Sequence, residues 1–216
     1  MPSKPSLTDL VLPERTAIVT QECQGAIVGP DAGLKALADV ARARAIPNLA
    51  RMLPIARAAG VHVVHCVMTR RPDGKGGNIN ARLFAAAASL DLDLTPGGAG
   101  ASVVPELGPE PSDLVLTRLH GLGPMGGTDL DPILRNLGVT TIVATGVSVN
   151  VAIINLVMDA VNAGYQVVLP RDAVAGVPED YADAVIDGTL ALLATVTMTN
   201  DLLEVWSEGE HGTRSS

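Results

Sequence analysis

The sequence predicts an α/β fold, a doubly wound and mostly parallel sheet of six strands with helices on both faces. Short apolar runs rich in Val and Ile alternate along the chain with Ala- and Leu-rich segments of helical periodicity. Residues 139–151 (Val-Thr-Thr-Ile-Val-Ala-Thr-Gly-Val-Ser-Val-Asn-Val) turn from an apolar strand directly into a helix, which is the connection such sheets use. With 216 residues, 47% of them hydrophobic and 2% aromatic, we expect one domain with an aliphatic core.

The first half of the chain is expected to supply two strands and three helices. The apolar run at 16–20 follows a polar, Pro-rich stretch, so we interpret residues 1–13 as an N-terminal arm. In the segment after Pro47, apolar residues recur at helical spacing; Pro54 is expected to kink this helix and Gly60 to end it. The expected strands are 16–20 and 61–68, and the expected helices are 34–45, 48–59 and a short Ala-rich one at 81–89.

The second half of the chain repeats the alternation of strands and helices, and the residues that mark helix ends are clearer there. Thr128 or Asp129 is a suitable N-cap for a helix that Gly138 ends, and Gly164 follows a largely apolar, hence buried, helix. The expected strands are 113–117, 140–145, 166–169 and 195–198, and the expected helices are 130–137, 150–163 and 181–193.

Residues 70–112 break this pattern because glycine and proline are frequent there. The segment is too long for an idle connection in a compact domain, so we interpret it as a lid or a subunit contact. A linker between two domains is disfavoured because neither flank would close a core alone. We therefore predict a single domain over 14–207 and a flexible tail over 208–216.

Composition excludes several classes of function. The net charge of −8 argues against nucleic acid and against an anionic membrane surface, and no apolar run reaches membrane-spanning length. The N-terminus shows no signal-peptide pattern, so a cytoplasmic location is expected. A homodimer or homotetramer is expected from the apolar faces and the long Gly/Pro segment.

The sequence indicates neither a metal nor a cofactor. Its four histidines lack metal-ligand spacing with a carboxylate, and the glycines at 121–127 match neither a Walker nor a dinucleotide pattern. Cys23 and Cys66 are interpreted as buried free thiols, and His65 as a core histidine with its hydrogen bonds satisfied.

Candidate site residues follow the carboxyl ends of the strands, where parallel sheets bind their ligands. The carboxylate of Glu22 and the guanidinium of Arg118 are expected to pair, either as a functional acid/base group held by a cation or as an ordinary ion pair. Arg70 and Arg71 would bind a substrate carboxylate or simply be solvated. Gln24 and His120 complete the set of candidate binding residues, and the turn after Gly146 is an anion or oxyanion site.

Several ordered motifs extend over most of the chain. They include Thr-Ala-Ile-Val-Thr-Gln-Glu-Cys-Gln at 16–24, Leu-Val-Leu-Thr-Arg at 114–118, Ala-Thr-Gly-Val-Ser-Val-Asn-Val-Ala at 144–152 and Ala-Gly-Tyr-Gln-Val-Val-Leu-Pro-Arg-Asp-Ala at 163–173. In their order and spacing the chain resembles the isochorismatase-like hydrolase superfamily, the cysteine hydrolases that include nicotinamidases and N-carbamoyl amidohydrolases.

The resemblance implies a site in which the usual catalytic residues are replaced. Glu22 stands at the position of the family's aspartate, Arg118 at that of its lysine and Ala152 at that of its nucleophilic cysteine. The family's cis peptide falls at Val147–Ser148, and N–H groups near Val151 and Ala152 would cradle an oxygen. Because alanine cannot form a thioester, the family's covalent route is closed to this chain.

Two hypotheses about function follow. In the first, the chain is a hydrolase that acts on a small, anionic metabolite by general acid catalysis from Glu22, as isochorismatases without that cysteine do. In the second, it is an inactive relative, a binding or scaffold protein that kept the pocket and lost the chemistry.

Overall fold

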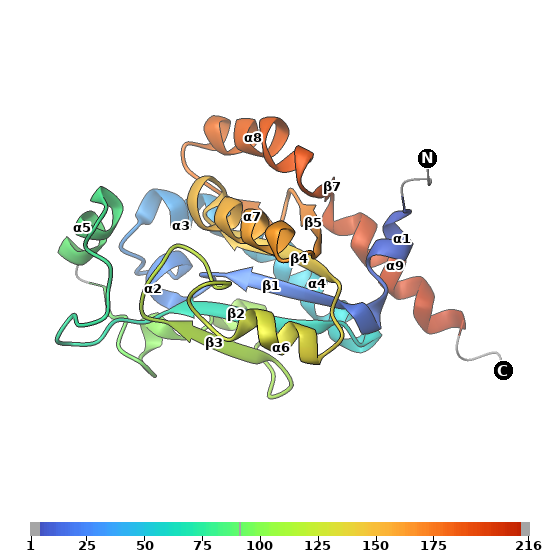
Figure 1. Cartoon of the computed structure of the whole chain (residues 1–216), viewed down its shortest axis with the longest axis horizontal. Helices are drawn as coiled ribbons and strands as arrows, with labels where there is room; N and C mark the ends of the chain where they lie inside the picture. Colours follow the sequence, from blue (N-terminus) through green and yellow to red (C-terminus); the bar gives the residue numbers. More distant parts are fainter. Residues whose placement is uncertain (1–4, 91, 213–216) are drawn as a thin grey trace.

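The computed structural model describes residues 5–90 and 92–212, with side chains up to residue 207. Its centre is a parallel sheet in the order β3-β2-β1-β4-β5-β7, with the two-residue β6 paired to β4 (Figure 1). The prediction of a doubly wound, parallel sheet with helices on both faces is confirmed, and β6 is the strand that the sequence did not reveal. The strands are β1 (Thr16–Gln21), β2 (His62–Met68), β3 (Leu114–Arg118), β4 (Thr141–Val147), β5 (Gln166–Pro170), β6 (Val174–Ala175) and β7 (Thr195–Thr197).

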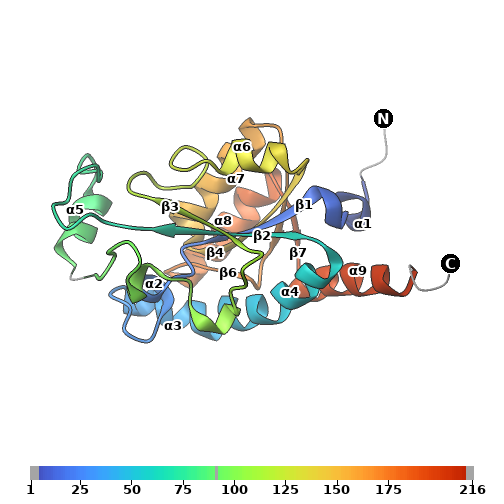
Figure 2. The same cartoon turned by 90° about the horizontal axis from the view of Figure 1, so that it is seen from below.

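Helices cover both faces of the sheet. Seen along the sheet, α2, α3, α4 and α9 lie on one side and α6, α7 and α8 on the other, while α5 projects at one end (Figure 2). The helices are α1 (Leu7–Leu10), α2 (Gly25–Val28), α3 (Lys35–Ala43), α4 (Ala45–Ala59), α5 (Arg82–Ser89), α6 (Leu130–Asn136), α7 (Ile154–Asn162), α8 (Glu179–Gly188) and α9 (Thr199–Gly212). Within the described residues, no helix is both long and apolar enough to cross a membrane.

The sheet separates two hydrophobic cores because successive side chains of a strand point to opposite faces. In β1, Ile18 packs into one core, and Ala17 and Val19 pack into the other. All three side chains are fully buried. The apolar runs that predicted the strands are therefore buried on both faces, as a sheet with helices on both sides requires.

Helix α4 begins three residues earlier than expected, at Ala45, and runs through Pro54 to Gly60, whose φ of 89° suits glycine. The predicted helix at 181–193 is divided into α8 and a short 3-10 helix, Leu190–Leu192.

Helix α9 was not predicted, and its last residues fall in the segment expected to be a tail. Asp172 fixes its start, since Oδ1 accepts hydrogen bonds from the Thr199 N–H (2.8 Å) and hydroxyl (2.9 Å). Trp206 is 1% exposed and donates from Nε1 to the Val11 carbonyl oxygen at 3.0 Å. This bond joins α9 to the N-terminal stretch.

Candidate active site

The candidate site lies where β1, β3 and β4 end. Glu22 directly follows β1 and adopts φ 53°, the left-handed region that non-glycine residues rarely occupy. Its N–H donates to the Cys66 carbonyl oxygen at 2.9 Å, which ties the turn to β2. Gly146 of β4 lies against this turn with φ 99°, and a Cβ there would approach the Gln21 nitrogen to 2.8 Å. The close contact between β1 and β4 therefore needs glycine at position 146.

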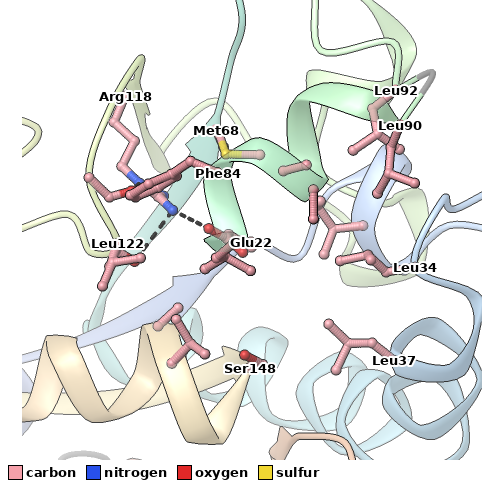
Figure 3. A pocket seen from close by; sticks show the side chains of 17 residues that line it. Glu22, Leu34, Leu37, Met68, Phe84, Leu90, Leu92, Arg118, Leu122 and Ser148 are labelled. Carbon is pink, nitrogen blue, oxygen red and sulfur yellow. Dashed lines mark hydrogen bonds and ion pairs between the residues drawn. The ribbon is translucent and has the colours of Figure 1, made fainter. Parts of the chain in front are cut away.

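An ion pair joins Glu22 to Arg118, the last residue of β3. Arg118 Nη2 donates to Glu22 Oε1 (Figure 3). The Arg118 side chain is 2% exposed and the Glu22 side chain 16%. Carbonyl oxygens of Gly121 and Leu122 accept further, longer bonds from the guanidinium, at 3.4 and 3.5 Å. Arg118 is thus held from several sides, and it fixes the Glu22 carboxylate.

Glu22, Arg118 and Ala152 line one pocket, the Glu22 pocket, with a cavity volume of about 160 Å³. Of the 17 described residues that line it, three carry polar side chains: Glu22, Arg118 and Ser148 (Figure 3). The structure thus brings together the three positions that the resemblance pairs with the family's catalytic residues. The rest of the pocket is apolar, and six of its large side chains, here called the apolar wall, are Leu34, Leu37, Leu83, Phe84, Leu90 and Leu92. In the close-up, Phe84 lies beside Arg118, whereas Leu34, Leu37, Leu90 and Leu92 lie away from the ion pair (Figure 3).

The turn after β4 forms the floor of this pocket. The Val147–Ser148 peptide is cis, at the bond where the resemblance places one. Ser148 and Val151 line the pocket, whereas Val147 is buried within β4. A π-helical turn, Val149–Ile153, follows and holds Ala152 at 3% exposure.

The Val151 N–H donates to the Ser148 carbonyl oxygen at 3.2 Å, so it is not free for a substrate oxygen. The Ser148 hydroxyl makes no hydrogen bond to any described residue, and it faces the pocket from the floor.

The other predicted binding residues lie outside the Glu22 pocket. Gln24 is fully buried, and its amide group bonds only to backbone atoms of Met68 and Gly100 at 2.6 to 2.9 Å. Arg70 Nη2 donates to the Ala87 carbonyl oxygen at 2.8 Å, and thus holds α5. Arg71 pairs with Asp73 on the surface, and His120 lines a neighbouring pocket with Arg70. Their side chains were predicted from strand position, which does not specify where a long side chain ends.

Neither native thiol is poised to act as a nucleophile. Burial raises the pKa of Cys23 to about 12, and the charge of Glu22 adds to that shift. Burial likewise raises the pKa of Cys66 to about 12. Both side chains are 1% exposed, so the interpretation of two buried free thiols agrees with the structure.

His65 belongs to a buried polar network beneath the site. Its Nδ1 lies 2.7 Å from the Thr20 hydroxyl and its Nε2 lies 3.2 Å from Asp113 Oδ2. Asp113 also accepts two bonds from Arg57, at 2.7 and 3.0 Å. Burial lowers the pKa of His65, although Asp113 opposes that shift. This is the satisfied core histidine that the sequence predicted.

The apolar wall was missed at the sequence level, although it supplies six of the 17 described residues that line the pocket. Its residues come from two places far apart in the sequence: Leu34 and Leu37 lie at the start of α3, Leu34 as the residue before its first turn, and the others lie in the 70–112 segment. The one available signal was Phe84, the single phenylalanine of the chain, on the one helix predicted inside that Gly/Pro-rich segment. Among the described residues, no group of three or more His, Cys, Asp or Glu side chains is placed to hold a metal ion.

An apolar pocket with a few polar groups, at the carboxyl edge of a parallel sheet, is the kind of site at which α/β proteins bind small molecules. The chain belongs to the isochorismatase family of hydrolases, because the model of the isochorismatase domain matches residues 16–201.

Individual relatives agree with this assignment. A ureidoacrylate amidohydrolase, RutB, of Rhizobium rhizogenes is 29% identical over 84% of this chain and 78% of its own length. YwoC of Bacillus subtilis, an uncharacterised isochorismatase family protein, is 30% identical, but the match spans only 48% of this chain and 54% of YwoC.

Solved structures share the fold. A cysteine hydrolase from Pseudomonas syringae pv. phaseolicola is 25% identical and superposes with a TM-score of 0.77, covering 96% of this chain and 99% of its own. An isochorismatase family protein from Desulfovibrio vulgaris is 26% identical and superposes with a TM-score of 0.74. The match covers 89% of this chain and 98% of that protein's chain.

Proposed function

We propose that the chain hydrolyses a small molecule by acid–base catalysis from Glu22, without a covalent intermediate. The observation that carries this proposal is that Glu22, bound to a buried arginine, opens on an apolar pocket that Ala152 also lines. Ala152 is the residue that the resemblance pairs with the family's cysteine. An alanine methyl group cannot attack a carbonyl carbon, so the family's covalent route is closed, and we assign the attack to a water molecule.

The reaction proceeds in two proton transfers. The Glu22 carboxylate takes one proton from a water molecule while the oxygen atom of that water bonds to the substrate carbonyl carbon. Glu22 then acts as the general acid and returns that proton to the leaving group as its bond to carbon breaks. Arg118 binds the Glu22 carboxylate and holds it in place for both transfers.

Amides and ureas are the first substrates to test, because relatives of this chain include proteins named ureidoacrylate amidohydrolase. Purified protein would be incubated with ureidoacrylate, N-carbamoyl compounds, simple amides, esters and isochorismate, beside a Glu22→Gln variant. Turnover in the wild type and its loss in the variant are expected. An equal rate in both on every compound would overturn the assignment to Glu22.

The second candidate is a binding protein without activity. It is favoured by one observation, that the pocket is present while the residue paired with the nucleophile by the resemblance, Ala152, carries no reactive group. Saturable binding of a compound that the protein never turns over would support this candidate against the hydrolase.

We further propose that the chain works in the cytoplasm as a homodimer or homotetramer, and that the 70–112 segment acts as a lid or subunit contact. The lid is supported by α5, none of whose residues is buried although Leu83, Phe84 and Ala87 line the pocket. Light scattering at micromolar concentration tests the assembly; a monomer would contradict it.

A further inference from the structure

The charge of the Glu22 pocket restricts what it can bind. Arg118 is the one cation among the described lining residues, and it is already paired with Glu22. The pair is neutral as a whole, and the remaining described side chains are apolar apart from Ser148. An anion placed there would lose its hydration without meeting a free positive charge, which is costly. The pocket therefore favours a neutral ligand, in contrast to the anionic one expected from the sequence.

A second pocket continues the first toward α3 and α5. It shares five lining residues with the Glu22 pocket, and these are Leu34, Leu37, Leu83, Ser148 and Val151. Its cavity volume is about 360 Å³. Lys35 and Asn150 are the polar side chains added there, and Lys35 is bound to Asp39 at 2.9 Å. Because the two pockets share these residues they adjoin, and together they are here called the channel, which starts at Glu22 and runs to the start of α3 past Leu83. Apart from Ser148, Lys35 and Asn150, the side chains that the second pocket presents are apolar.

We propose that this channel binds a neutral amide or ester with an unbranched apolar chain. The carbonyl group lies at Glu22 and Ser148, and the chain extends past Leu37 and Leu83. The inference rests on the proposed function for the position of the reacting carbonyl, but the selection of a neutral, apolar chain follows from the channel itself. Apolar chains are bound in proportion to the surface they remove from water.

The test is a binding series rather than an activity assay. Primary amides from acetamide to octanamide, and the carboxylates of equal length, would be titrated by ligand-detected NMR, which reports occupancy whether or not the ligand is later hydrolysed. Each added methylene is expected to lower the amide Kd roughly fourfold until the channel is filled. Each carboxylate is expected to bind at least about tenfold more weakly than the amide of the same length. Carboxylates that bind as tightly as the amides, or amides whose Kd is independent of length, would overturn the proposal.

A matched pair of variants assigns the effect to the channel. Leu37 is half-buried and packs at the edge of the core, so Leu37→Ser removes apolar surface from the channel at a limited cost in stability. It is expected to raise the Kd of octanamide several-fold while leaving that of acetamide unchanged. Leu192→Ser, at a side chain 82% exposed on the 3-10 helix after α8, is the control. Equal effects of both variants on octanamide would contradict a channel along α3.

The outcome separates this inference from the hydrolase proposal. Length-dependent binding without turnover of any compound keeps the channel and rejects the hydrolase. Turnover confined to short polar or charged compounds keeps the hydrolase and rejects the apolar channel.

Discussion

Arg118 at the end of β3 reaches across the end of β2 to bind the carboxylate of Glu22 at the end of β1. The two residues are on strands that are not neighbours, and Met68, the last residue of β2, is the register partner of Arg118. A charge pair in this position links the carboxyl ends of three strands. Because Arg118 is 2% exposed, its charge depends on Glu22 for compensation.

The first prediction is that Glu22 and Arg118 are energetically coupled. Glu22→Gln leaves a buried guanidinium without its carboxylate, and Arg118→Met leaves a carboxylate facing an apolar pocket. We expect each single change to lower the free energy of unfolding by about 1 to 4 kcal/mol. Urea denaturation of both single variants and of the double variant would measure the coupling.

The double variant is expected to cost at least about 1 kcal/mol less than the sum of the two single changes, since neither charge is then left alone. Strict additivity would show that the pair has no net role in stability. The surface pair Lys35–Asp39, with side chains 79% and 61% exposed, is a control for which a coupling of only a few tenths of a kcal/mol is expected.

Much of this arrangement could be read from the sequence because it depends on backbone position. A residue that directly follows an apolar parallel strand must lie at the ligand-binding edge, so Glu22, Arg118 and the turn at Ser148 were found in that way. Gln24, Arg70 and His120 satisfy the same rule, yet their side chains point elsewhere. Gln24 bonds to backbone atoms of Met68 and Gly100, Arg70 bonds to the Ala87 carbonyl oxygen, and His120 lines a neighbouring pocket. Strand position alone does not specify such contacts.

The apolar wall and α9 were missed for a different physical reason. Leu34, Leu37 and Leu83 carry no chemical signature, and only the placement of their two chain segments around one pocket turns them into a binding surface. Helix α9 needs Asp172, 27 residues earlier, to bind its first N–H groups. Interactions between distant segments decide both features, whereas sequence periodicity reports only local ones.

The second prediction concerns Gly146. Its φ of 99° and the approach of an added Cβ to the Gln21 nitrogen (2.8 Å) make any side chain costly there. Gly146→Ala is expected to lower the free energy of unfolding by about 2 to 4 kcal/mol and to displace Glu22. Gly188→Ala in α8, where an added Cβ meets nothing within 4 Å, is the control and should be neutral or slightly stabilising. Thermal and urea unfolding of both variants measure the difference; similar losses in both would contradict it.

The third prediction is a pH dependence of stability that arises from His65. Burial lowers the pKa of His65 in the folded protein below its ordinary value of 6.5. Just below pH 6.5 the histidine is therefore protonated in the unfolded chain but still neutral in the folded protein. The stability contributed by neutral His65 is complete above pH 6.5 and is lost as the pH falls below it. At most about 1.4 kcal/mol is lost per pH unit in this range.

Urea unfolding at pH 7.5 and 5.5 would test this dependence. His65→Gln should show a smaller loss between the two pH values than the wild type, whatever its stability at pH 7.5. His62→Gln on the same strand, at a partly exposed side chain, is the control and should keep the wild-type dependence. Equal pH dependence in wild type and His65→Gln would show that other groups are responsible.

The last prediction tests whether a side chain at position 152 is accessible to a reagent in the Glu22 pocket. Ala152→Cys introduces a thiol that lines the Glu22 pocket, whereas Cys23 and Cys66 are 1% exposed with pKa values of about 12 and so are almost entirely protonated at pH 8. Labelling with iodoacetamide, followed by peptide mass spectrometry, should therefore modify the introduced thiol at least about tenfold faster than either native thiol. Ala160→Cys, at a fully buried position of α7 outside the pocket, is the matched control and should label as slowly as the native thiols. If both introduced thiols reacted at one rate, position 152 would not be accessible from the pocket, and the assignment of the nucleophile position to Ala152 would fail.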